Sequence, residues 1–429
     1  MSAIGQAAWW RLSRRQTLGS IFGLLGLYLV GYVAPHLDDA RKAITFERPP
    51  DPLQLDFSPT AVVAGIGLVF LVTAVASFFE RRQLRVVQAL LGASALLCIP
   101  LVVVVGLALS DAPSTNGMQL LVESLKLGTP VALGAMAGLW CERAGVVNIG
   151  IEGMMLAAAA VGFMAYALGG DARGGAWLWL AVLAAVLTGG LVGLLHAVLS
   201  VTFRVDQIIS GVVINLLALG ATGFIRSEVI VPSGVSTGIS TSEVALPGLS
   251  EIPIVGEQLF TNKPIFFSMF LVVAGSALVL QRTRFGLRVR SCGENPHAAE
   301  TLGVDVIRIR YAAVVLGGLV AGLAGAWFSL ESQAGFEDNM TNGTGFIALA
   351  ALIFGRWRPS TAFLGAMLFG FARALGARLQ ILGVEVGDFS IPSELWQSLP
   401  FVVTIVVVAG AVGRAIPPAA DGIPFERSR

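Results

Sequence analysis

Long apolar stretches separated by short polar ones make up most of this 429-residue chain. A helix needs roughly 20 apolar residues to cross the hydrocarbon layer of a membrane. We therefore expect an all-α, polytopic bundle of transmembrane helices. Judged by apolar length and by the residues that break helices, the spans are predicted at 17–35, 60–79, 86–109, 119–140, 149–169, 177–203, 207–226, 264–281, 309–331, 360–380 and 393–412.

A shorter apolar run lies at 345–355 and follows polar, glycine-rich sequence. It is too short to cross as a straight helix. It predicts a broken or re-entrant helix, whose free backbone groups need partners inside the protein. A flexible loop followed by a tilted span is the alternative.

Composition agrees with a membrane protein, because 55% of the residues are hydrophobic and only 13% are charged. Soluble domains carry about a quarter charged residues. The three cysteines are single and unspaced, so they indicate neither a disulfide framework nor a metal site. We expect contact with membrane lipid, no bound metal and no nucleic-acid partner.

Basic residues gather in one set of loops, which places these loops in the cytoplasm together with both chain termini. The densest basic segment, 281–310, holds six of the 25 arginines. Inside it, Asn295 can cap a helix, Pro296 suits the first helical position and Gly303 can end the helix. The sequence therefore predicts a short cytoplasmic helix suited to docking.

Small residues recur at helical spacing within the spans, as in Gly189 with Gly193 and Gly318 with Gly322. Because lipid offers no hydrophobic drive for helix association, such residues let helix backbones approach closely. They predict a tightly packed bundle.

Five segments together carry a resemblance over about residues 117–412. The segments are ERAGVVNIGIEGMM at 142–155, DQIISGVVINLLALG at 206–220, RTRFGLRVRSCGENPHAAETLGV at 282–304, LAGLAGAW ending at Trp327, and GFIALAALIFGRWRP at 345–359. With these segments the chain resembles the membrane subunit of ABC importers in the ribose and branched-chain amino acid permease superfamily, most closely the nucleoside (simple-sugar-type) permeases.

The resemblance implies that the predicted short helix is a coupling helix, which docks on a cytoplasmic ABC ATPase. The residues carried over for this contact are Arg288, Arg290, Gly293, Glu294, Asn295, Pro296, Ala298 and Ala299. It also implies a second permease subunit, expected to be a paralogue in a heterodimer, and an extracytoplasmic substrate-binding lipoprotein. A basic loop without a docking role is the alternative.

No lysine follows a glycine in a phosphate-binding loop pattern, so the chain is not expected to bind ATP in this way. We expect no enzyme activity and no cofactor on this chain, with Mg-ATP held by the partner ATPase. The expected domains are an extension with about three extra spans at 1–116, the permease domain at 117–412 and a cytoplasmic tail at 413–429.

Nucleosides are the expected small-molecule substrate, moved by alternating access across the cytoplasmic (inner) membrane. A sugar, a branched-chain amino acid or another polar solute, or an ion-coupled secondary carrier, are the alternatives. Polar side chains in or near the spans are the candidate pathway residues: Asn148, Glu152, Gln207, Ser210, Asn215, Glu331, Gln333, Asn339 and Asn342. Bonds between helices are the alternative role for Asn215, and local capping or pairing with Arg143 is the alternative for Glu152.

Overall fold

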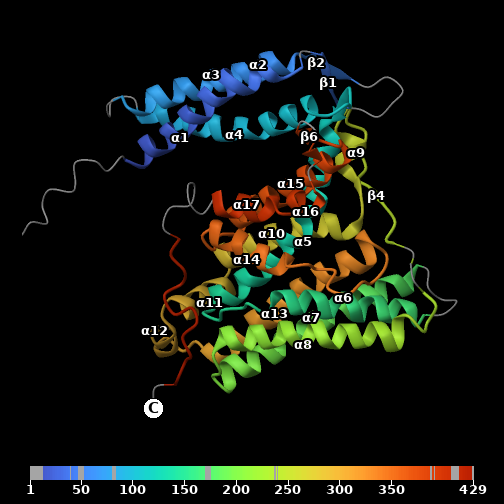
Figure 1. Cartoon of the computed structure of the whole chain (residues 1–429). Coiled ribbons are helices and arrows are strands. Elements are labelled where there is room, and N and C mark those ends of the chain that lie inside the picture. Colours follow the sequence, from blue (N-terminus) through green and yellow to red (C-terminus); the bar gives the residue numbers. More distant parts are fainter. Residues whose placement is uncertain are drawn as a thin grey trace, which may run out of the picture. The chain divides into compact units, whose positions relative to one another are not determined.

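The computed structural model describes residues 13–38, 40–46, 53–79, 84–169, 175–235, 238, 240–386, 389–390, 392–406 and 415–427. The described chain is mostly helical and divides into two compact units (Figure 1). Unit 1 comprises Met1–Leu120 with Leu375–Leu399, and unit 2 comprises Leu121–Ala374 with Pro400–Arg429.

Nine helices in the described part of the chain are long and apolar enough to cross a membrane. They confirm nine of the predicted spans, usually to within a few residues. Their bounds are Arg15–His36, Pro59–Ser77, Arg85–Ala108, Gly117–Arg143, Ala176–Thr202, Gln207–Ile230, Pro264–Arg282, Val306–Ser332 and Pro359–Ile381.

Two predicted spans differ from the structure. The span expected at 149–169 is a shorter helix of 17 residues, α6 (Ile151–Ala167). The region expected to form one span at 393–412 contains two short helices, α16 (Ser393–Gln397) and α17 (Leu399–Val406). Pro400 has no N–H with which to continue the hydrogen bonding of α16. Residues 407–412 lie outside the described part of the chain.

Three helices form the core of unit 1. A helix begins with α1 (Arg14–Tyr28) and continues through a π-helical turn, η1 (Leu29–Val33), into α2 (Ala34–His36). It packs against α3 (Pro59–Ser77), and α4 (Leu84–Ala108) completes the bundle. The buried side chains between them are Leu29, Ala34, Val63, Ile66, Phe70, Leu101 and Val104.

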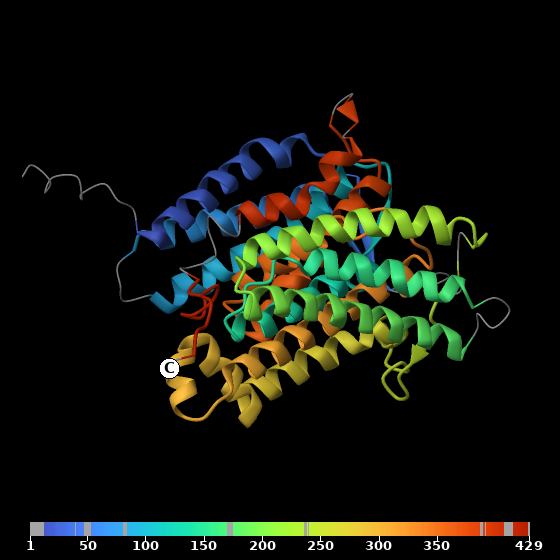
Figure 2. The same ribbon diagram turned by 90° about the horizontal axis from the view of Figure 1, so that it is seen from below.

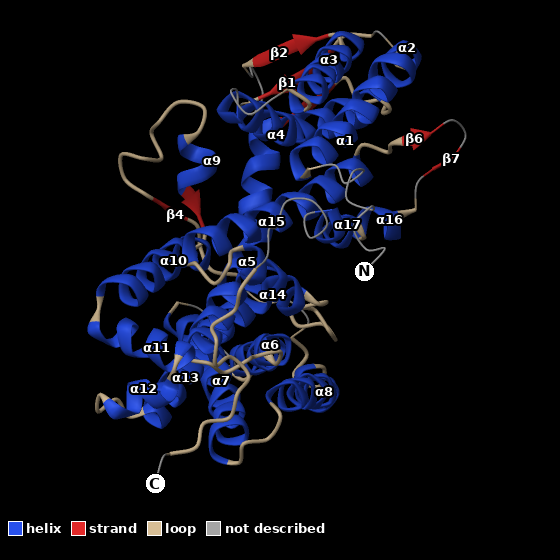
Figure 3. Ribbon diagram, turned by 90° about the vertical axis from the view of Figure 1, so that its left-hand side faces the viewer, coloured by secondary structure: helices blue, strands red, loops and turns tan. Residues whose placement is uncertain are grey.

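A small sheet in unit 1 departs from the all-α expectation (Figure 3). Strand β1 (Lys42–Thr45) runs antiparallel to β2 (Gln54–Phe57) and parallel to β3 (Ser114–Asn116). The buried Lys42 Nζ donates to the carbonyl oxygen of Ser110 at 2.8 Å, which ties the sheet to the chain after α4.

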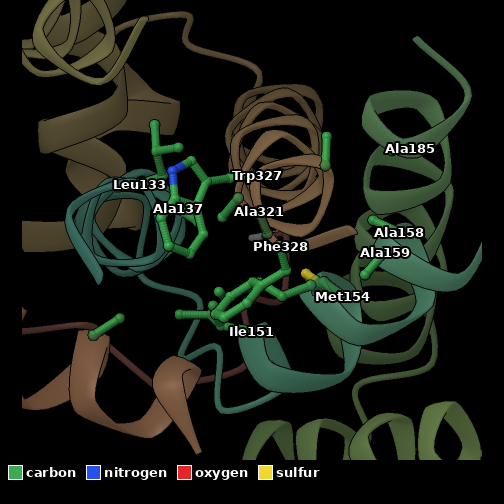
Figure 4. Packing of buried hydrophobic residues seen from close by; sticks show 14 of the residues in the cluster. Leu133, Ala137, Ile151, Met154, Ala158, Ala159, Ala185, Ala321, Trp327 and Phe328 are labelled. Carbon is green, nitrogen blue, oxygen red and sulfur yellow. The ribbon is translucent and has the colours of Figure 1, made fainter. Parts of the chain in front are cut away.

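Unit 2 packs its helices around an apolar interior (Figure 4). Its long helices are α5 (Gly117–Arg143), α7 (Ala176–Ala197), α8 (Gln207–Ile225), α10 (Pro264–Arg282), α13 (Val306–Ala326) and α15 (Pro359–Ile381), of which α15 ends in unit 1. Three of them continue as π-helical turns: η4 (Val198–Thr202) after α7, η5 (Arg226–Ile230) after α8 and η6 (Trp327–Ser332) after α13.

Helices α7 and α13 touch at the small residues that the sequence singles out. A Cβ atom placed on Gly189 would lie 2.4 Å from the carbonyl oxygen of Gly318, and one on Gly193 would lie 3.0 Å from the Cα of Gly318. Only glycine therefore fits at this crossing. The prediction of close backbone approach is confirmed here.

Shorter elements complete the chain. They are β4 (Val244–Ala245) paired with β5 (Thr261–Asn262), α9 (Gly256–Phe260), α11 (Arg284–Glu294), α12 (Pro296–Thr301), α14 (Thr344–Phe354) and the pair β6 (Glu385–Val386) and β7 (Phe389–Ser390). Helix α14 has 11 residues, as its short apolar run predicts.

Candidate functional site

Between α10 and α13, the basic segment forms two helices, α11 and α12, that meet at a sharp bend. The Oδ1 atom of Asn295 accepts a hydrogen bond from the Ala298 N–H at 3.0 Å, and Pro296 occupies the first position of α12. Gly303 follows the helix in a left-handed conformation, with a φ of +81°. The predicted short helix is therefore present, with the predicted cap and end.

Helix α12 has an exposed face and a buried face. Ala298 is exposed together with Glu294 and Asn295 beside the helix start, whereas Gly293, Pro296 and Ala299 are buried against the rest of unit 2. The first three can meet a partner protein, while the buried three hold the helix in place. The flanking Arg288 is exposed, and Arg290 is half-buried with no hydrogen-bond partner at Nε.

Leu302 is not among the predicted contact residues, yet it is 85% exposed. It lies four positions after Ala298, and residues at this spacing share one helix face. The four-residue spacing from Ala298 was thus the signal in the sequence that could have added Leu302 to the predicted contact residues. Leu302 therefore extends the exposed face of α12.

The end of α11 packs directly on the end of α5. A Cβ atom on Gly293 would lie 2.3 Å from the carbonyl oxygen of Arg143, so the two backbones are in contact. The Arg143 side chain donates from Nε and Nη2 to the Trp357 carbonyl at 2.8 and 2.6 Å, and its Nη1 lies 3.8 Å from a Glu294 carboxylate oxygen. The segment that leads into α12 therefore contacts the end of α5 directly.

Glu152 holds the N-terminus of α14 against α6. One carboxylate oxygen accepts from the Thr341 hydroxyl at 2.6 Å and from the Gly343 N–H at 2.8 Å, and the other accepts from the Gly345 N–H. A carboxylate is favourable there because the first N–H groups of a helix are unsatisfied and carry partial positive charge. Glu152 is used for this contact, and Arg143 has the separate partners described above.

Glu331 fixes the N-terminus of α10 in the same way. Its carboxylate accepts from the backbone N–H groups of Ile265 and Phe266 at 2.7 and 2.9 Å, and from the Thr241 hydroxyl at 3.2 Å. The neighbouring Lys263 donates to the Glu331 carbonyl. Burial lowers the pKa of Lys263, and the Glu331 carboxylate acts in the opposite direction.

Two polar side chains of α8 bond to the chain around the start of α6. Gln207 accepts from the Val147 N–H at 2.7 Å. Asn215 accepts from the Gly153 N–H at 2.7 Å and donates to the Ile149 carbonyl at 3.0 Å. Asn215 therefore joins two helices.

A buried imidazole adds to this attachment of α8. His196 lies within hydrogen-bond distance of the Ser210 hydroxyl and of the Val147 carbonyl, both at 3.0 Å. The histidines are scattered in the sequence, so nothing in their spacing pointed to this role. Asn148 donates to the Cys141 sulfur at 3.3 Å, and its buried Oδ1 has no partner.

Three predicted pathway residues stand apart from these contacts. Gln333, Asn339 and Asn342 are exposed, in the chain between η6 and α14. Asn339 and Asn342 have positive φ angles of +54° and +41°, a conformation that asparagine tolerates better than most residues. Their side chains are exposed and face away from the packed interior.

Comparison with known proteins identifies the family. The profile described as "Branched-chain amino acid transport system / permease component" matches residues 120–408. The guanosine ABC transporter permease protein NupQ of Bacillus subtilis is 38% identical over 312 residues, covering 71% of this chain and 96% of that protein. The nucleoside ABC transporter permease protein NupC of Lactococcus lactis is 38% identical over 318 residues, covering 73% and 99%.

A putative glucose ABC transporter permease protein of Haloferax volcanii is 34% identical over 311 residues, covering 69% of this chain and 92% of that protein. No solved structure gives a significant match. The apolar helices and these matches identify a multi-pass membrane protein that works with an ATPase and a substrate-binding protein and has no catalytic site of its own. The chain therefore belongs to the branched-chain amino acid transport system permease family, as the permease component of an ATP-binding cassette importer.

Proposed function

We propose that this permease carries nucleosides inward across the cytoplasmic membrane by alternating access. The observation that carries the proposal is the 38% identity to permeases named for guanosine and for nucleosides, over nearly their whole length. Glucose is the second candidate, because a relative with 34% identity is named a putative glucose permease.

The exposed face of α12 is the proposed contact with the ATPase, which holds Mg-ATP. The exposure of this face supports the role, and so does the contact of the adjoining Gly293 at the end of α11 with the end of α5. The proposed contact residues are Arg288, Glu294, Asn295 and Ala298, with Gly293, Pro296 and Ala299 shaping the segment from behind and Arg290 beside it.

The proposed pathway draws on two kinds of polar residue. Gln333, Asn339 and Asn342 are exposed, so they can bind a hydroxyl-rich solute directly. The buried set is engaged in contacts within the protein, so it would shape the path by fixing α6, α8, α10 and α14. That set is Asn148, Glu152, Gln207, Ser210, Asn215 and Glu331.

The remaining partners follow from the same proposal. A paralogous second permease would complete the translocation path, and a lipoprotein would deliver the solute from outside. Both termini of this chain would lie in the cytoplasm, which the basic loops support.

Reconstitution of all subunits in vesicles tests the substrate. We expect ATP-dependent uptake of guanosine, with excess unlabelled nucleosides competing and glucose or leucine having no effect. Uptake that persists with a catalytically inactive ATPase contradicts the importer mechanism. ATP-dependent uptake of labelled glucose without uptake of guanosine would move the proposed substrate to a sugar.

The same assay tests the docking face. Ala298→Trp adds a bulky ring to the exposed side of α12, so we expect loss of ATPase binding and of uptake. Gln281→Trp is the matched control, because Gln281 is also exposed but lies on α10. Equal uptake by the two variants would contradict the proposal that α12 contacts the ATPase.

A further inference from the structure

The C-terminal segment Ala415–Arg427 runs beside α11 and α12 within unit 2 (Figures 1 and 2). We call it the C-terminal strap. Pro417, Pro418 and Pro424 restrict its backbone, so it loses less entropy on ordering than an ordinary tail would. The strap lies beyond the residues 120–408 that the family profile matches.

The strap bonds to the exact corner where α11 turns into α12. The Ala420 N–H donates to the Gly293 carbonyl at 2.8 Å, and the Ala419 N–H donates to a Glu294 carboxylate oxygen at 3.3 Å. Both acceptors immediately precede the cap of α12. The strap therefore fixes the bend that sets the direction of that helix.

A buried arginine joins the strap to two other elements. Arg310 on α13 is 1% exposed, and it donates from Nε to the Ala144 carbonyl at 3.1 Å and from Nη1 to the Ile423 carbonyl at 3.0 Å. One planar guanidinium thus links α13, the loop after α5 and the strap. Such a fork of donors cannot be replaced by a lysine.

The backbone at this junction leaves no spare room. Gly145 has a φ of +83°, and a Cβ atom on it would lie 2.8 Å from Arg310 Nη2, 3.0 Å from the Ala420 carbonyl and 3.4 Å from the Cys292 carbonyl. Four segments therefore meet around one glycine. A shift of one of them relative to the others would therefore meet close contacts at this glycine.

The Phe425 ring supports α12 from its inner side. It is 5% exposed and packs with Cys292, Ala299 and Val306, and its centroid lies 5.2 Å from that of His297. The outer ion pairs of the strap, Arg204 with Glu426 and Arg427 with Asp305, are solvent-exposed, and such pairs contribute little. The buried Phe425 and Arg310 are therefore expected to hold the strap more firmly than these exposed pairs do.

We propose that the C-terminal strap fixes α12 to α5 and α13, with Arg310 as the positioning residue, so that force applied to α12 moves both helices together. This inference rests on the proposed role of α12 as the ATPase contact. Without the strap, α12 could still bind the ATPase, but it would shift without moving α5 and α13.

The natural Cys292 reports on the strap in a chain carrying Cys98→Ala and Cys141→Ala. The Cys292 thiol is buried, and burial raises its pKa to about 11, so it should react slowly with a maleimide. Phe425→Ala removes a buried ring, and we expect about tenfold faster labelling of the purified complex. Phe425→Leu should restore protection.

Coupling is measured on the same variants as guanosine carried per ATP hydrolysed in reconstituted vesicles. We expect Phe425→Ala and Arg310→Lys to lower this ratio by about fivefold or more, because α12 would then move without moving α5 and α13. Binding of the ATPase should be retained. Ile423→Ala is the matched control. Its side chain is 54% exposed, and the variant keeps the carbonyl that Arg310 uses.

Each result has one meaning. Unchanged labelling of Cys292 in Phe425→Ala overturns the attachment, and faster labelling with an unchanged transport ratio overturns the coupling role. A wild-type complex without ATP-driven uptake overturns the proposed function instead, while labelling still decides whether the strap covers Cys292.

Discussion

Two buried carboxylates in unit 2 each fix the start of a helix other than their own. Glu152 and Glu331 each accept backbone N–H groups at the start of another helix, α14 and α10 respectively. A buried carboxylate is costly unless such partners compensate it, and removing it would leave buried donors unpaired. A charged residue inside an apolar span can therefore mark a helix attachment as readily as a solute path.

The strap carries a half-buried carboxylate, Asp421, that is expected to make its attachment depend on pH. Burial raises the pKa of Asp421 from 3.8 to about 7, opposed by Arg310 and by the Gly422 N–H, and its Oδ1 has no hydrogen-bond partner. A raised pKa in the attached state means that attachment is strongest with Asp421 protonated. Its contribution is complete below the pKa of the free carboxyl and is lost as the pH rises through about 7.

We expect Cys292 to be better protected at pH 6 than at pH 8, and Asp421→Asn to reduce this difference. The labelling rate of wild type divided by that of Asp421→Asn at each pH cancels the intrinsic pH dependence of the thiol reaction. The carboxylates of Glu142, Glu294 and Asp305 also lie near Asp421 or Cys292, and the Asn variant leaves all three in place. A ratio that is constant from pH 6 to pH 8 contradicts the prediction.

Among the elements, α7 and α13 form the closest crossing described above. Gly189→Ala would bring a methyl group within 2.4 Å of the Gly318 carbonyl, so we expect a destabilisation of about 1–3 kcal/mol from overpacking. Gly220→Ala on α8 is the control, because a Cβ there meets nothing within 4 Å. Thermal unfolding in detergent measures both, and equal midpoints would contradict the prediction.

Elements set by local sequence were predictable. Apolar length located nine spans, and the Asn295-Pro296 pair located α12, because membrane thickness and helix caps act over a few residues. The sheet of unit 1 and the strap escaped prediction. Arg310 and Ile423 lie 113 residues apart, and no local pattern announces that their atoms meet.

The candidate site residues also include a part that the sequence predicted and a part that it did not. The sequence marked polar residues in the spans but could not say which are engaged by other helices and which are exposed. Asn215 lies in a predicted span and Asn339 in polar sequence between two apolar runs, but the sequence does not show that the first bonds two backbone groups while the second is exposed. Tertiary contacts alone make this distinction.

At the scale of the whole molecule, the chain is longer than the permease core. The family profile begins at residue 120, and the Bacillus and Lactococcus relatives align over 96% and 99% of their own length with only 71% and 73% of this chain. We propose that residues 1–116 are an extension to the 117–412 permease domain, followed by a tail at 413–429. Transport by the core should not require the extension.

Removal of residues 1–116 should therefore leave ATP-dependent uptake near the wild-type level while lowering thermal stability. Within unit 1, Arg378 Nε donates to the Thr115 hydroxyl at 2.8 Å, and Leu379 packs over Gly106, so the deletion strips partners from α15. Thr115→Val in the full chain isolates the lost hydrogen bond, whose expected cost is about 1–3 kcal/mol. Uptake and the midpoint of thermal unfolding are compared for wild type, the deletion variant and Thr115→Val in one lipid mixture. Lipid can replace the apolar contacts that residues 1–116 make, but it cannot replace a part that they play in transport. A deletion variant that folds and binds its ATPase yet fails to transport would therefore show that the extension takes part in translocation.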